Sequence, residues 1–204
     1  RGRRHGQLCT FMHVSSVAVK GSHTGRFYEH ELDLGQNFIN TYERSKFEAE
    51  AVVRRFNEPG VSVDIVRPGS ISDMSDPSWG TLVTRQIMEY YLLRLLSRRI
   101  FEAIPMNPDT RMNITGARLV AEMIHLIACT PRQSGRVYHV LRPTYIKVID
   151  ALKAFRDITG IPLPRCIPAE RFPFEKLTPI QRKMVDVYVP YWNQKPTVFD
   201  VTNT

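Results

Sequence analysis

The sequence has 204 residues, of which 43% are hydrophobic and 24% are charged, ordinary values for a globular chain with a buried core. Its net charge of +8 favours anionic partners, but the basic clusters at Arg1–Arg4 and Arg94–Arg99 lack the interleaved aromatics of a nucleic-acid site. No apolar run spans a bilayer, and no secretory signal is visible. The three cysteines, Cys9, Cys129 and Cys166, form neither a metal motif nor a disulfide framework. We therefore expect a cytoplasmic protein with no nucleic-acid partner, membrane span or metal site.

Short β-rich runs alternate with amphipathic helices, a pattern typical of an α/β fold with a parallel sheet. The segment Leu8–Val19 is predicted to open as a buried strand, and a helix is predicted over Thr41–Phe56. A second strand is predicted over Val61–Val66, and Arg67-Pro68-Gly69 closes it.

The composition changes after Gly80, and the pattern there predicts further helices and one strand. The expected helices are Leu82–Arg99, Thr115–Cys129 with Asn113 or Thr115 as its cap, Thr144–Thr159 stopped by Gly160, and Pro179–Tyr188 capped by Thr178. The expected strand covers Arg136–Leu141. The tail from Pro190 is expected to be irregular.

The sharpest chemical feature is the Tyr-x-x-x-Lys sequence at Tyr42 and Lys46. A spacing of four on a helix puts the phenol and the ammonium on one face, close enough to share a small site. A nearby cation stabilises the phenolate, which makes Tyr42 a usable proton donor and acceptor. Alone, such a pair is weak evidence, because an exposed Tyr beside a Lys is common on protein surfaces.

The neighbouring strands strengthen this interpretation. The preceding strand ends in Ser15-Ser16, and active sites of parallel α/β sheets lie at the carboxyl ends of strands. A serine hydroxyl there can hydrogen-bond a carbonyl oxygen on which charge develops. His13 and His139 lie within apolar runs, and we interpret them as core or crevice-edge histidines rather than catalytic groups.

These motifs together resemble the extended short-chain dehydrogenase/reductase family. In that family a strand ending in a Ser/Thr motif and a glycine precedes a Tyr-x-x-x-Lys helix, and the next strand ends in Arg-Pro. Here the corresponding pieces are His13–Gly21, Tyr42–Lys46 and Val63–Gly69. The second serine, Ser16, matches the catalytic Ser/Thr by its position relative to the glycine.

Within this family the chain looks most like the thioester reductase branch, whose domains release carrier-protein-bound or CoA-bound acyl groups as aldehydes or alcohols. The resemblance rests on Glu31–Gln36, Asn40–Glu50 and Gly135–Val140. Two segments depart from the branch pattern, at Asp73–Gly80 and at Thr115–Arg118. Both lie on the expected substrate side, so the resemblance leaves the identity of the substrate open.

The resemblance implies a Rossmann-like, doubly wound parallel sheet with a smaller substrate-binding lobe. Residues 1–80 would form the C-terminal half of the cofactor-binding domain, and residues 81–204 mainly the substrate lobe, with some elements returning to the sheet. The family's glycine-rich phosphate-binding turn is not found in this sequence, which also lacks an initiator Met. We therefore expect that turn upstream of residue 1, and expect this chain by itself to be inactive.

The resemblance also implies specific roles for five residues. Ser16, Tyr42 and Lys46 would be catalytic. The cofactor would be NADPH more readily than NADH, with Tyr42 and Lys46 at its ribose and nicotinamide. The backbone of Pro68 and Gly69 would border the nicotinamide.

The substrate implied is an acyl thioester, carried either by CoA or by an acyl carrier protein on phosphopantetheine. Ser16 would contact its carbonyl, and Met74 and Trp79 could line the acyl or phosphopantetheine channel. Two alternatives stay open: a nucleotide-sugar epimerase, dehydratase or reductase of the same superfamily, and a non-catalytic, degenerate reductase module that binds a partner protein. The sequence does not indicate the oligomeric state.

Overall fold

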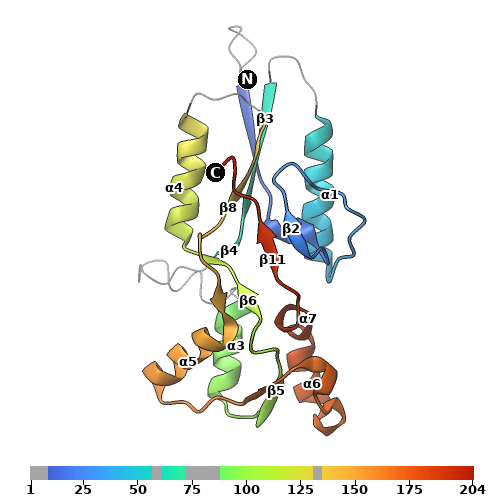
Figure 1. Cartoon of the computed structure of the whole chain (residues 1–204), viewed down its shortest axis with the longest axis vertical. Coiled ribbons are helices and arrows are strands. Elements are labelled where there is room, and N and C mark those ends of the chain that lie inside the picture. The colour runs from blue at the N-terminus through green and yellow to red at the C-terminus, as the bar shows by residue number, and fades with distance from the viewer. Residues whose placement is uncertain (1–8, 57–60, 72–87, 131–134) are drawn as a thin grey trace. The chain divides into compact units, whose positions relative to one another are not determined.

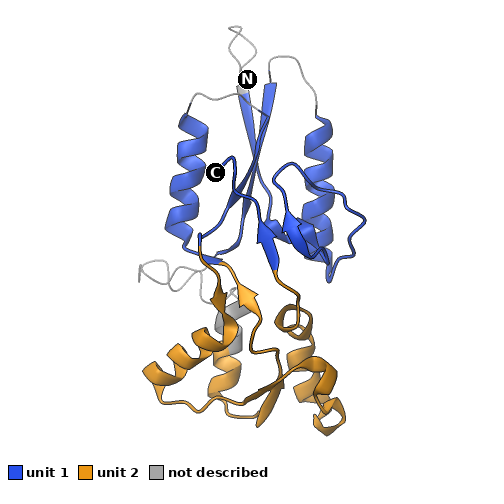
Figure 2. Cartoon of the chain, viewed as in Figure 1, with its two compact units in different colours: residues 1–71, 114–143, 197–204 blue, residues 72–113, 144–196 orange. Residues whose placement is uncertain are grey.

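The computed structural model of the chain describes residues 9–56, 61–71, 88–130 and 135–204. The chain divides into two compact units (Figure 2). Unit 1 contains residues 1–71, 114–143 and 197–204, and unit 2 contains residues 72–113 and 144–196. Residues 114–143 and the last eight residues thus belong to the unit that contains the first strand.

Unit 1 is built on a three-stranded parallel sheet with the order β1-β3-β8. Its strands are β1 (Cys9–Val14), β3 (Val61–Pro68) and β8 (Val137–Val140). Two helices, α1 (Thr41–Arg55) and α4 (Ala117–Cys129), lie on opposite sides of these strands (Figure 1). Because β1 and β3 are parallel neighbours joined through α1, their carboxyl ends lie at the same edge.

Alternation of side chains along β1 and β3 separates an apolar layer from a polar one. Val66 packs in a buried cluster with Val120 and Ile127 of α4 and with Tyr138 of β8. The next residue, Arg67, points to the other face and is fully buried. The expected α/β fold with a parallel sheet is confirmed.

Smaller elements complete unit 1. They are the 3-10 turn η2 (Val17–Lys20) and the short strands β2 (Gly25–Phe27), β4 (Ser70–Ile71), β7 (Ile114–Thr115) and β11 (Thr197–Phe199). β2 pairs in parallel with β11, and β4 in parallel with β7. The tail from Pro190 was expected to be irregular, and this is wrong, because part of it is a strand that joins unit 1.

Unit 2 is mainly helical and has its own apolar core. Its elements are α3 (Met88–Ser97), β5 (Ala103–Pro105), β6 (Arg111–Met112), β9 (Ile146–Lys147), α5 (Val148–Thr159), β10 (Arg165–Ile167), η3 (Ala169–Arg171), η4 (Phe174–Lys176), α6 (Pro179–Asp186) and α7 (Val189–Trp192). β5 pairs in parallel with β10, and β6 antiparallel with β9. The core contains Leu95, Ile104, Leu152 and the stacked rings of Tyr188 and Trp192.

Several predicted boundaries differ from the structure. The first strand ends at Val14, just before the predicted end at Ser15-Ser16, because the Ser16 side chain accepts a hydrogen bond from the Ala18 amide and starts η2. The helix predicted from Thr115 begins two residues later, since Thr115 pairs with Ile71 in β4. Its N-cap is Gly116, which offers no side-chain cap.

The helix predicted from Thr144 begins at Val148, because Ile146 and Lys147 pair with β6.

Two predicted signals for helix ends are confirmed. Gly160 closes α5 in a left-handed conformation, and Thr178 begins α6 with a capping box that includes Gln181. Of the helix predicted over 82–99, residues 88–97 are helical, and 82–87 lie outside the described residues.

Candidate active site

The carboxyl end of β1 presents two buried serines. The Ser15 amide donates to the Val66 carbonyl at 2.8 Å, which extends the ladder to β3 by one residue beyond the strand. The Ser16 Oγ accepts from the Ala18 amide at 3.1 Å, and the chain turns into η2. A hydroxyl that accepts one hydrogen bond keeps its own proton, so Ser16 can still donate to a ligand.

Helix α1 carries Tyr42 and Lys46 in its first two turns. Asn40 caps the helix by accepting from the Glu43 amide at 2.9 Å, so the helix begins one residue before Tyr42. The Lys46 Nζ donates to the Val14 carbonyl at 3.3 Å, at the last residue of β1. The structure therefore brings the ammonium to the strand end that also carries Ser16.

The Tyr42 side chain is 54% exposed. Its hydroxyl and that of Ser16 form no hydrogen bond with each other in the part of the chain that is described, where Ser16 is engaged with Ala18. The exposed phenol of Tyr42 is open to an incoming ligand. The convergence of Ser16 and Tyr42 on one substrate oxygen stays a prediction.

The carboxyl end of β3 lies between those of β1 and β8. Pro68 is buried and pairs with Val140, and the Gly69 amide donates to the Val140 carbonyl at 3.2 Å. Pro68 and Gly69 therefore belong to the same sheet edge as Ser16. Their contact with a nicotinamide stays a prediction. Met74 and Trp79, the predicted substrate-channel residues, lie outside the described residues.

Sequence reasoning missed a buried ion pair behind this edge. Arg67 of β3 donates from Nη2 to Glu50 Oε1 at 2.7 Å and from Nε to Oε2 at 3.0 Å, and both side chains are fully buried. The Ser15 hydroxyl donates to the same Glu50 Oε2 at 2.6 Å. Burial alone would raise the pKa of Glu50, but the Arg67 guanidinium and the Ser15 hydroxyl together hold it below its ordinary value.

His139 of β8 completes this group. Its Nε2 lies 3.0 Å from Arg67 Nη1, and because arginine can only donate, Nε2 is the acceptor. Its Nδ1 therefore carries the proton and donates to the Asp200 carbonyl at 2.6 Å. Burial, helped by the Arg67 charge, lowers the pKa of His139 to about 4. His139 is a neutral core histidine, as interpreted from the sequence.

His13 differs from His139 in having one buried ring nitrogen, Nε2, without a hydrogen-bond partner among the described residues. Burial lowers the pKa of His13, Glu50 opposes that shift and Lys46 adds to it. His13 thus lies near the same buried carboxylate as Ser15.

The residues at this edge suit a dinucleotide cofactor in part. Lys46 has three N–H donors, one of them directed at Val14, and the others can serve ribose hydroxyls. Tyr42 and Ser16 add hydroxyl donors for a substrate oxygen. In the described segments, no group of three or more His, Cys, Asp or Glu side chains could hold a metal ion. None of the described helices has the length and apolar character to cross a membrane.

A parallel sheet flanked by helices, with a serine and a Tyr-x-x-x-Lys helix at its carboxyl edge, defines a Rossmann-like domain of the extended short-chain dehydrogenase/reductase class. The model of the NAD-binding family described as "Male sterility protein" matches residues 3–124. The chain belongs to this thioester-reductase-like family, as the sequence resemblance implied. None of the curated proteins matches it.

Solved structures share the fold at low identity. The terminal R domain from the myxalamid PKS-NRPS biosynthetic pathway has a TM-score of 0.70 and 20% identity, over 95% of this chain and 51% of that one. The aureusimine biosynthetic cluster reductase domain has a TM-score of 0.68 and 19% identity, over 95% and 52%. UDP-glucuronic acid 4-epimerase from Bacillus cereus has a TM-score of 0.62 and 13% identity, over 95% and 53%. The chain thus spans about half the length of these structures.

Proposed function

We propose that this chain is the catalytic and substrate-side part of an NAD(P)H-dependent reductase that converts an acyl thioester into an aldehyde or alcohol. The observation that carries the proposal is the contact between Lys46 and the last residue of β1. It brings the Tyr-x-x-x-Lys helix to the strand end that holds Ser16. Membership of the male sterility protein family supports it. The fold shared with two biosynthetic reductase domains is consistent with it.

In this proposal each side chain acts at a stated atom. The reduced nicotinamide cofactor, NADPH rather than NADH, supplies the hydride when bound. Lys46 Nζ holds ribose hydroxyls, and the backbone of Pro68 and Gly69 borders the site. Ser16 Oγ donates to the thioester carbonyl oxygen, and Tyr42 Oη gives its proton to that oxygen as negative charge develops there.

One hydride and one proton suffice to reach the aldehyde. Hydride addition to the thioester carbon, with the proton from Tyr42, would give a hemithioacetal. Its carbon–sulfur bond then breaks while the hydroxyl proton passes to sulfur, which releases the thiol and leaves the aldehyde. Conversion of the aldehyde into an alcohol would need a second molecule of reduced cofactor and a second proton.

The substrate side of the proposal rests on unit 2 and on the segment after β4. Met74 and Trp79 would line the acyl or phosphopantetheine channel, as the sequence predicts. An acyl carrier protein is the proposed partner, and the net charge of +8 suits an acidic one. A cytoplasmic location fits the free thiols of Cys129 and Cys166, which a reducing compartment preserves.

A second candidate has the same fold. The similarity to UDP-glucuronic acid 4-epimerase favours a sugar-nucleotide enzyme, which would use Ser16, Tyr42 and Lys46 in a step that begins with oxidation. The two candidates differ in the first direction of hydride transfer and in the substrate.

The test uses the purified full-length protein. NADPH is offered with an acyl-CoA or an acyl-pantetheine thioester, and its consumption is followed by absorbance. In parallel NAD is offered with UDP-sugars, and the sugar products are separated by chromatography, because epimerisation leaves no net reduced nicotinamide. The proposal predicts NADPH consumption with thioesters and none with UDP-sugars. Turnover of UDP-sugars alone would replace it with the second candidate, and no turnover of either substrate would favour a non-catalytic module.

A further inference from the structure

Three elements of unit 1 meet at one buried carboxylate. Glu50 belongs to α1 and has no exposed surface. Its Oε2 accepts from the Ser15 hydroxyl at the end of β1 at 2.6 Å. Arg67, at the end of β3, donates to both Glu50 oxygens at 2.7 and 3.0 Å. These are the three elements that carry the proposed catalytic and cofactor-binding residues.

The position of Glu50 on its helix is informative. Tyr42, Lys46 and Glu50 follow one another at intervals of four, so they lie along one side of α1. A bidentate arginine–carboxylate pair fixes both distance and orientation. With Glu50 held in this way, α1 cannot slide or turn against the sheet without breaking these bonds. The partly exposed bond from Lys46 to Val14, at 3.3 Å, is a weaker restraint.

The arginine is itself held from several sides. Arg67 donates to the backbone carbonyls of Glu29 and Glu31 and to His139 Nε2. Its guanidinium also lies 5.0 Å from the centre of the Phe27 ring. The carboxylate of Glu50 is therefore hydrogen-bonded to a guanidinium whose own position is fixed by these contacts.

We propose that Glu50 is a positioning residue for the reductase, and that its bonds to Ser15 and Arg67 set Tyr42 and Lys46 in place relative to Ser16. This inference rests on the proposed function, because it assigns Glu50 a purpose in that chemistry. Small errors of placement are costly in catalysis, since a displacement of about 1 Å can lower a rate by about a hundredfold.

Ser15→Ala is the sharpest test, because it removes one bond to Glu50 and leaves the ion pair with Arg67 intact. Ser62→Ala is the matched control. The Ser62 hydroxyl also lies between β1 and β3, where it donates to Thr10 Oγ1 at 3.1 Å near the other end of the strands. We expect Ser15→Ala to lower kcat about tenfold, with KM for NADPH within about twofold of the unmodified protein. Ser62→Ala should leave both constants within about twofold.

A second pair of variants addresses the carboxylate directly. Glu50→Gln keeps the shape of the side chain and removes its charge, and Glu48→Gln makes the same change at an exposed position of α1. Glu50→Gln should lower kcat at least as much as Ser15→Ala, and Glu48→Gln should not. If Glu50→Gln does not fold, Ser15→Ala and Ser62→Ala still decide the question.

Backbone hydrogen exchange gives a readout that needs neither cofactor nor turnover. In Ser15→Ala the amides from Ser16 to Ala18 and those of the first turn of α1 should exchange at least about fivefold faster, and in Ser62→Ala they should not. Equal kcat in the two serine variants, with unchanged exchange in both, would overturn the inference. If the unmodified protein consumes no NADPH with thioesters, the proposed function fails, and the exchange comparison alone decides whether Ser15 and Glu50 hold this geometry.

Discussion

The buried ion pair between Arg67 and Glu50 allows a quantitative prediction for Arg67→Met. Methionine approximates the length of the arginine stem but cannot donate a hydrogen bond, so Glu50 would keep its charge in a fully buried position without its main partner. The carbonyls of Glu29 and Glu31 and the Nε2 of His139 would lose a donor as well.

Removal of one partner from a buried ion pair costs about 3–5 kcal/mol, because the remaining charge stays in a poorly solvated place. Arg54 Nη2 lies 2.9 Å from Glu50 Oε1 in the part of the chain that is described, but its side chain is 27% exposed, so we expect it to compensate the charge of Glu50 only in part. For a chain of this size, each kcal/mol lowers Tm by about 2–4 °C, so Arg67→Met should lower Tm by about 6–20 °C. Replacement of both partners, as in Arg67→Met with Glu50→Leu, should recover about half of the loss or more, since neither member of the buried ion pair is then left without the other.

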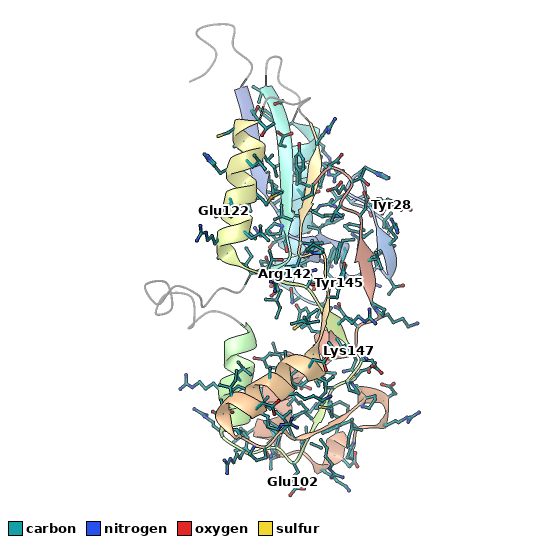
Figure 3. The ribbon with its side chains drawn as sticks, turned by 60° about the vertical axis from the view of Figure 1, so that its left-hand side comes forward. Tyr28, Glu102, Glu122, Arg142, Tyr145 and Lys147 are labelled. Carbon is teal, nitrogen blue, oxygen red and sulfur yellow. The ribbon has the colours of Figure 1, made fainter. Side chains whose placement is uncertain are left out.

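Thermal unfolding followed by circular dichroism measures this effect. Arg118→Met is the control, because Arg118 pairs with Glu122 on the surface of α4, where the two side chains are 84% and 59% exposed. Figure 3 shows Glu122 on the side of α4 that faces away from the strands. The control should shift Tm by no more than about 2 °C. The reasoning is refuted if Arg67→Met behaves like the control, or if the double variant is less stable than the single one.

Two further predictions concern stability. The pKa of His139 is about 4 in the folded chain and 6.5 when unfolded, so between these values the unfolded state binds more protons and the free energy of unfolding falls as pH falls. In urea titrations, the free energy of unfolding should fall by about 3 kcal/mol between pH 7 and pH 4. His139→Asn should make this dependence on pH weaker. An equally steep dependence in that variant would contradict the low pKa of His139. Gly21→Ala should lower the free energy of unfolding more than Gly160→Ala does. The expected loss for Gly160→Ala is about 1–2 kcal/mol. Both glycines have positive φ, but a Cβ at Gly21 would lie 2.2 Å from the Asn37 carbonyl oxygen and one at Gly160 meets nothing within 4 Å, so equal losses in chemical denaturation would argue against that contact.

The parts of the fold that depend on neighbouring residues could be predicted from the sequence. The helix containing Tyr42 and Lys46 has clear periodicity and runs over Thr41–Arg55, within one residue of the prediction. Gly160 predicted the end of α5 because a residue without a side chain readily adopts the left-handed conformation found there. Thr178 predicted the start of α6 because its hydroxyl caps the first turn.

The parts that depend on residues far apart in the sequence could not be predicted. Glu50 looked like one more polar position on an amphipathic helix, and only the fold shows it buried against Arg67. Likewise β11 pairs with β2, some 170 residues earlier, although Thr197–Phe199 follows two prolines and carries no strong strand signal. The sequence contains one signal for this ion pair. Glu50 lies four residues after Lys46, on the same side of the helix, and the following strand ends with Arg67.

Catalysis by the phenol of Tyr42 is tested most directly by Tyr42→Phe in the full-length protein, with NADPH binding followed by fluorescence and thioester reduction by absorbance. Removal of one exposed hydroxyl should leave the NADPH dissociation constant within about threefold, while kcat falls at least about a hundredfold, as expected for loss of a general acid. Turnover by the phenylalanine variant at a rate close to that of the unmodified protein would show that the proton comes from elsewhere.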